Sequence, residues 1–159
     1  MQATEASEIG QSAPDFRLKG PGGHFLTLSE HRGRKNVVLV FYPLAFSPVC
    51  SHQLLVIQKD LDAFRLLDAE VFGISVDSHY ANEAFARQLR ISFPLLSDFR
   101  RETSTAYGVL NPEKLYSGRA VFVIDKQGRI AYKEQSPAPG DVDQIPSVAQ
   151  ALDALARLS

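Results

Sequence analysis

The sequence contains one cysteine, Cys50, within the segment FYPLAFSPVCSHQL. Ser47 and Pro48 precede it, and these residue types are typical of the N-cap and the first position of a helix. Cys50 would then be the third residue of that helix. The amide N–H groups of a first helical turn have no intrahelical acceptor, so they can stabilise a thiolate or a bound oxygen. This spacing favours a reactive thiol over an inert one.

A helix N-terminus by itself stabilises a thiolate only modestly, by about 0.3–1 kcal/mol. We therefore expect a further cation near Cys50. Ionisation alone cannot make the thiol fast, because nucleophilicity falls as the thiolate becomes more stable. Most of any acceleration must come from donors that stabilise charge developing on the substrate. Ser47 is the nearest candidate donor in the sequence.

The elements that would position Cys50 follow from the hydrophobic pattern around it. Residues 36–43 (NVVLVFYP) are apolar on both faces, which predicts a central strand that Pro43 ends. From Pro48 onward, apolar residues recur at helical spacing: Leu54, Ile57, Leu61 and Phe64. The pattern therefore predicts a strand that leads directly into an amphipathic helix.

The rest of the chain repeats this alternation. The pattern predicts a strand at Val71–Val76, a helix around Tyr80–Leu89 capped by Ser78, and a shorter helical piece ending near Gly108. Two strands, AVFVID and RIAYK, follow on either side of the turn Lys126–Gly128. The last helix has an apolar stripe: Val148, Leu152, Leu155 and Leu158.

Two short alternating stretches near the N-terminus, Phe16–Leu18 and Phe25–Leu28, are separated by glycines and a proline and predict a β-hairpin. Together these elements predict an α/β fold, a thioredoxin-like sandwich with a mixed central sheet and an N-terminal β-hairpin. Since the chain has 159 residues and no linker-like segment, we expect a single domain over residues 1–159.

Composition argues against several classes of partner. Lys and Arg total 17, Asp and Glu total 18, and no block of like charge suggests binding to nucleic acid or to an anionic membrane. The longest apolar run, Val37–Tyr42, is too short to span a bilayer, and Met1–Ser12 lacks a signal-peptide pattern, so we expect a cytoplasmic protein. The histidines are scattered and predict no metal site: His24, His31, His52 and His79.

Five segments, in this order and at these spacings, resemble the peroxiredoxins: APDF, HRGRKNVVLVFYP, PLAFSPVC, FPLLSD and GRAVFVID. Within that family the sequence is similar to the one-cysteine branch related to the alkyl hydroperoxide reductase E type, from about Ile9 to Leu158. The family signature is a proline, a Thr or Ser, the reactive cysteine and a distant arginine before a strand. This sequence has these residue types at the matching positions: Pro43, Ser47, Cys50 and Arg119.

The resemblance implies a role for each of these residues and an activity for the chain. Cys50 is the peroxidatic thiolate, Ser47 hydrogen-bonds the peroxide, Pro43 shields the sulfur from water, and Arg119 supplies the cation and polarises the O–O bond. The implied activity is a thiol-dependent peroxidase that reduces hydrogen peroxide and alkyl hydroperoxides. Cys50 becomes a sulfenic acid, which an external thiol then reduces. The resemblance implies no metal, haem or flavin cofactor, and it implies a homodimer.

Two features depart from the family pattern. Gln53 stands where the family usually has a glutamate, so any ion pair with the active-site arginine is replaced by a neutral contact. No second cysteine is present to resolve an oxidised Cys50, and the helical position used by one subfamily is Leu55. We therefore expect the reductant to be a low-molecular-weight thiol or a thioredoxin- or glutaredoxin-like protein.

Two other functions remain open from the residues alone. The first is a catalytically silent thioredoxin-like interaction module. The second is a cysteine hydrolase that uses Cys50 with a histidine such as His79. A disulfide oxidoreductase is disfavoured because the sequence lacks a Cys-x-x-Cys pair.

Overall fold

The computed structural model describes residues 8–138 and 140–158, which contain a seven-stranded sheet with the strand order β2-β1-β5-β4-β3-β6-β7. Strands β3, β4 and β5 are parallel, whereas β6 and β7 continue the sheet in antiparallel fashion. The strands are β1 (Arg17–Lys19), β2 (Phe25–Thr27), β3 (Asn36–Phe41), β4 (Ala69–Ser75), β5 (Leu95–Ser97), β6 (Ala120–Ile124) and β7 (Ile130–Gln135). This mixed thioredoxin-like α/β architecture is the predicted one.

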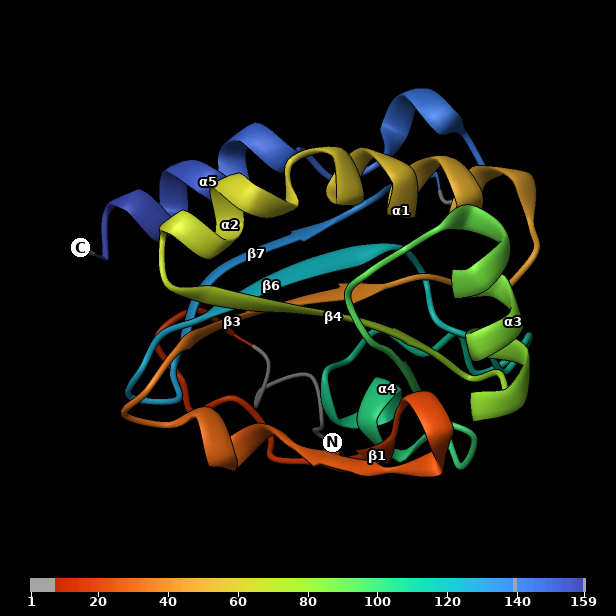
Figure 1. Cartoon of the computed structure of the whole chain (residues 1–159), viewed down its shortest axis with the longest axis horizontal. Helices are drawn as coiled ribbons and strands as arrows, with labels where there is room; N and C mark the ends of the chain where they lie inside the picture. Colours follow the sequence, from red (N-terminus) through yellow and green to blue (C-terminus); the bar gives the residue numbers. More distant parts are fainter. Residues whose placement is uncertain (1–7, 139, 159) are drawn as a thin grey trace.

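Helices cover both faces of the sheet. They are α1 (Pro48–Lys59), α2 (Leu61–Leu66), α3 (His79–Leu89), α4 (Glu102–Ala106) and α5 (Val148–Ala156), with short 3₁₀ helices at Pro21–Gly23, Leu28–His31 and Val142–Gln144. Helices α1, α2 and α5 lie on one side of the sheet and α4 lies on the other (Figure 1). Among the described residues, no helix is both long enough and apolar enough to cross a membrane.

Strand β3 forms the centre of the core, because its side chains are buried on both faces. Val38 and Val40 belong to the hydrophobic cluster under α1, α2, α3 and α5, whereas Leu39 and Phe41 belong to the cluster on the opposite face. The parallel neighbour β4 and the antiparallel neighbour β6 pair with β3 along most of its length. The loop after β3 therefore starts from a rigid support.

The predicted N-terminal hairpin is confirmed as β1 and β2, and it joins the main sheet through the pair Lys19 and Ser97. Strand β5 was missing from the expected elements. It has three residues after Pro94, too few to show an alternating pattern, and it exists because it pairs with the end of β4. Only tertiary structure supplies that pairing.

Two expected helices need correction. The helix predicted from Pro48 onward is interrupted at Asp60, which ends α1 and precedes α2; its amide donates to the carbonyl of Ile57 in a tightened turn. The predicted stripe of the last helix is wrong at Leu158, which lies beyond the end of α5 and is 38% exposed. Small side chains take its place in the core: Ala151 and Ala154 are buried with Leu155.

Gly73 of β4 has no side chain, which leaves room for Leu95 and for Tyr42, the residue that follows β3. A methyl group at this position would lie 2.6 Å from Cδ2 of Leu95 and 3.2 Å from Cε1 of Tyr42. Both neighbours are buried and cannot move freely. We predict that Gly73→Ala lowers the free energy of unfolding by about 1–3 kcal/mol because it overpacks the core. Chemical denaturation measures the change.

Gly140→Ala is the matched control, since its added methyl would meet no atom within 4 Å. A Gly73→Ala protein as stable as the wild type would contradict this account of the packing between β4 and Tyr42.

Candidate active site

The loop at residues 42–47 connects the carboxyl end of β3 to α1 and places Cys50 in the first turn of that helix. Helix α1 begins at Pro48, so Cys50 is its third residue, as predicted. Ser47 has the extended backbone of an N-cap, with φ −82° and ψ 146°. Pro43 is buried and lies two residues after the end of β3. The sequence therefore located the loop and the helix start correctly.

The cation expected near the sulfur is Arg119. Its Nη1 atom donates a hydrogen bond to Sγ of Cys50 at 3.0 Å, and both side chains are buried. Arg119 directly precedes β6, and the pairing of Ala120 with Phe41 brings it next to the loop that follows β3. The sheet thus joins two residues that are 69 positions apart in the chain. A guanidinium at this distance favours the thiolate form of a cysteine.

Ser47 does not use its side chain to cap α1. Its hydroxyl oxygen is buried and has no hydrogen-bond partner in the described part of the chain. The carbonyl of Ser47 instead accepts bonds from the amide and the hydroxyl of Ser51. Ser47 and Cys50 lie on the same helical turn, so the structure leaves an unengaged hydroxyl close in the fold to the thiol. A buried polar group of this kind is costly unless a ligand or water engages it.

Gln53 takes the position of the usual glutamate and still contacts the arginine. Its Oε1 atom accepts a hydrogen bond from Arg119 Nη1 at 3.0 Å, and the side chain is buried. The Nε2 atom of Gln53 has no partner among the described residues. The same guanidinium nitrogen therefore contacts the thiol and a neutral amide. Gln53 orients Arg119 without adding a negative charge.

Sequence reasoning missed the polar residues that hold the loop. The hydroxyl of Tyr42 donates to Oδ1 of Asn82 at 2.6 Å, and the hydroxyl of Ser117 donates to the carbonyl of Tyr42 at 3.2 Å. All three residues are buried. Burial raises the pKa of Tyr42 well above its usual value, so its hydroxyl stays protonated and can donate. Asn82 lies in α3 and Ser117 precedes β6, so no local pattern along the chain groups these residues with Tyr42.

The histidines do not approach Cys50 in any contact that would assist it. His79 lies at the start of α3, where its ring contacts that of Tyr80 in a tilted arrangement with centroids 4.0 Å apart. His52 is exposed on α1. Over residues 8–138 and 140–158, no three His, Cys, Asp or Glu side chains come close enough together to hold a metal ion.

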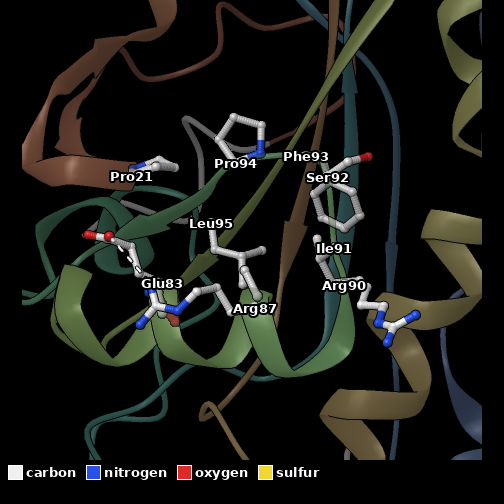
Figure 2. Close-up of a pocket in the computed structure, with 11 residues that line it drawn as sticks. Pro21, Glu83, Arg87, Arg90, Ile91, Ser92, Phe93, Pro94 and Leu95 are labelled. Atoms are coloured by element: carbon white, nitrogen blue, oxygen red, sulfur yellow. Dashed lines mark ion pairs between the residues drawn. The ribbon is translucent and has the colours of Figure 1, made fainter.

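A surface pocket of about 290 Å³ lies between α3 and β5, and Asn82 is among its lining residues. Figure 2 shows its lining, with the ion pair of Glu83 and Arg87 on α3 and with Arg90 at the end of that helix. None of the four predicted site residues lines this pocket. The candidate active site is therefore the buried contact at the start of α1.

Known proteins resemble both the sequence and the fold. Residues 9–133 match the model of the AhpC/TSA family. Alkyl hydroperoxide reductase E of Mycobacterium tuberculosis is 39% identical over 136 residues, which cover 84% of this chain and 88% of that protein. A putative peroxiredoxin of Synechocystis is 38% identical over 139 residues, covering 81% of this chain and 69% of that protein.

Among solved structures, peroxidoxin BcpB of Mycobacterium tuberculosis superposes with a TM-score of 0.84 and 28% identity, covering 96% of this chain and 98% of that one. The reduced 2-Cys peroxiredoxin of Plasmodium vivax gives a TM-score of 0.83 and 30% identity, covering 93% and 80%. The family and the names of these relatives support a thiol-peroxidase activity. Sequence, fold and site agree, and the chain belongs to the AhpC/TSA family of peroxiredoxins.

Proposed function

We propose that this chain is a one-cysteine peroxidase that reduces hydrogen peroxide and alkyl hydroperoxides. The observation that carries the proposal is the 3.0 Å contact between Arg119 Nη1 and Cys50 Sγ at the start of α1. This contact places a full positive charge beside the sulfur, which the N-terminus of α1 alone does not provide. The unengaged hydroxyl of Ser47 adds a hydrogen-bond donor for a bound oxygen.

In the first step the Cys50 thiolate attacks the terminal oxygen of the hydroperoxide. A sulfur–oxygen bond forms, the O–O bond breaks, and the leaving alkoxide or hydroxide takes a proton to become an alcohol or water. Sulfur is oxidised to the sulfenic acid and the peroxide is reduced. Arg119 and Ser47 donate to the peroxide oxygens, where negative charge develops in the transition state.

In the second step an external thiol reduces the sulfenic acid. The first thiol forms a mixed disulfide with Cys50 and releases water, and a second thiol releases the Cys50 thiol as an external disulfide forms. Cys50 is fully buried, so a thiol larger than a peroxide can reach it only if the first turn of α1 opens. A low-molecular-weight thiol or a thioredoxin- or glutaredoxin-like protein fits this role.

The loop that precedes α1 supports access for alkyl as well as inorganic peroxides. Leu44 and Phe46 are 37% and 50% exposed, so they give the loop an apolar outer surface. Apolar contacts of this type discriminate weakly between substrates. The homodimer implied by the family resemblance stays a prediction. The cytoplasmic location stays a prediction.

The two rival functions lack comparable support. A cysteine hydrolase needs a general base beside the nucleophile, whereas Cys50 receives a hydrogen bond from a guanidinium, which cannot accept a proton. A silent binding module gives no reason for a buried arginine to contact the one thiol. Ester turnover without peroxide would favour the cysteine hydrolase. A Cys50 thiol that does not react with peroxide would favour the silent binding module.

The one-cysteine mechanism predicts the product of stoichiometric oxidation. After one equivalent of hydrogen peroxide without reductant, the intact mass should rise by one oxygen, about 16 Da, because Cys50 has no cysteine partner in its chain. Excess peroxide should add a second oxygen as sulfinic acid forms. Mass spectrometry with trapping of the sulfenic acid by dimedone measures both species.

Cys50→Ser is the matched control, because Met1 can also gain an oxygen. The variant should fold, resist dimedone and consume no peroxide. A wild type that lost hydrogens on oxidation, or that turned over peroxide steadily with no thiol added, would contradict the mechanism.

Gln53 provides a test of the charge balance around Arg119. In Gln53→Glu, a carboxylate would compete with the thiolate for the guanidinium, so the pH at which half of Cys50 is ionised should rise. Ultraviolet absorbance of the thiolate, followed against pH, measures this midpoint. The side chain keeps its shape, so the fold should be retained.

Gln88→Glu makes the same chemical change on the exposed surface of α3 and should leave the thiolate midpoint where it is. If Gln53→Glu also left the midpoint unchanged, Arg119 would not be the cation that stabilises the thiolate.

A further inference from the structure

A cluster of polar side chains lies at the carboxyl end of β4 and has no part in the chemistry described above. This β4 cluster consists of Ser75, Asp77 and Asn82; Ser75 and Asn82 are fully buried and Asp77 is half-buried. Polar groups in such positions need hydrogen-bond partners to offset their desolvation. Two of those partners, Tyr42 and Ala45, belong to the loop at residues 42–47, which leads into the helix that carries Cys50.

Asp77 makes the contact with the middle of this loop. Its Oδ2 atom accepts a hydrogen bond from the amide of Ala45 at 2.7 Å and another from the hydroxyl of Ser75 at 2.8 Å. Hydrogen bonds to a carboxylate are stronger than those between neutral groups. The hydroxyl of Ser97 in β5 donates to the carbonyl of Asp77 at 2.6 Å. The carboxylate is therefore fixed to the sheet and holds the loop.

The loop needs this restraint because of the backbone at Phe46. Phe46 has φ +68°, in the left-handed region that residues with a side chain rarely adopt. Such a conformation persists only where its surroundings hold it. The ring of Phe46 contacts Phe85 of α3 with centroids 5.1 Å apart, but it is half exposed. The bond from Ala45 fixes the residue next to this strained position.

Ser47 follows Phe46, so the loop conformation determines where its hydroxyl lies. That hydroxyl is buried and unengaged although Ser47 occupies the N-cap position. In a relaxed N-cap it would accept a hydrogen bond from the first turn of α1. The other members of the β4 cluster hold the beginning of the loop, since Asn82 accepts from Tyr42 and donates to the carbonyl of Leu96.

We propose that Asp77 is a positioning residue for the peroxidase reaction: through the amide of Ala45, its carboxylate holds the loop so that the Ser47 hydroxyl stays available to the hydroperoxide. This inference rests on the proposed function, because only a peroxide-reducing Cys50 gives the Ser47 hydroxyl a substrate to bind.

The test compares two reactions of Cys50 in Asp77→Ala. Oxidation by hydrogen peroxide requires the Ser47 hydroxyl to be in place, whereas alkylation by iodoacetamide depends on the thiolate and on opening of the first turn of α1 but not on that hydroxyl. The rate constant with peroxide should fall by about tenfold or more, because small displacements of a positioned group are costly. The rate of alkylation should stay within about threefold of the wild type. Faster alkylation would instead indicate that the site had simply opened.

Two further variants serve as an intermediate case and a control. Asp77→Asn keeps an oxygen acceptor for the Ala45 amide but loses the charge, so its peroxide rate should lie between those of Asp77→Ala and the wild type. Asp62→Ala removes an exposed carboxylate from α2 and should change neither rate. If Asp77→Ala does not fold, Asp77→Asn takes its place in the cycle below.

A double-mutant cycle with Ser47→Ala decides whether Asp77 acts through Ser47. In the Ser47→Ala background, loss of the Asp77 carboxylate should slow peroxide reduction by no more than about twofold, since the group that it positions is already absent. The inference would be overturned if the rate losses of the Asp77 and Ser47 variants were additive in the double mutant. It would also be overturned if the Asp77 variant reduced peroxide as fast as a reactive wild type. A wild type that does not react with peroxide would contradict the proposed function itself.

Discussion

The buried contact between the guanidinium of Arg119 and the thiol of Cys50 is the interaction on which the rest of this site depends. Two groups that carry charge in the reactive state are removed from water, and this is tolerable only because they are 3.0 Å apart and further hydrogen-bonded. Three elements bring them together: β3, its antiparallel neighbour β6, and α1. A shift of one residue between β3 and β6 would carry Arg119 to the other face of the sheet.

Gln53 and the β4 cluster position two different parts of the site. Gln53 holds the guanidinium from within α1 and adds no charge, so the thiolate does not compete with a carboxylate at that position. Asp77, two residues after β4, holds the loop and does not contact the sulfur. One side chain therefore orients the cation and another orients the segment that carries Ser47. Helix α1 begins at Pro48, directly after this loop.

Most of the fold and the start of the site could be predicted from local patterns. The run at 36–43, the spacing of Ser47, Pro48 and Cys50, and the glycine-rich turn of the hairpin are signals carried by neighbouring residues. Strand β5 and the break at Asp60 could not be found in this way, because pairing with β4 creates the first and a tightened turn creates the second. The partnership of Arg119 with Cys50 came from family resemblance alone, and the role of Asp77 depends on a contact 32 residues away.

The most direct test of the account measures peroxide reduction by Arg119→Met at a pH where Cys50 is entirely thiolate in both proteins. Under this condition the variant cannot be slow for lack of ionised sulfur. If the guanidinium also stabilises charge on the departing oxygen, the second-order rate constant should be lower than that of the wild type by about 100-fold. Equal rate constants for the two proteins would contradict the account, because Arg119 would then do no more than ionise the thiol.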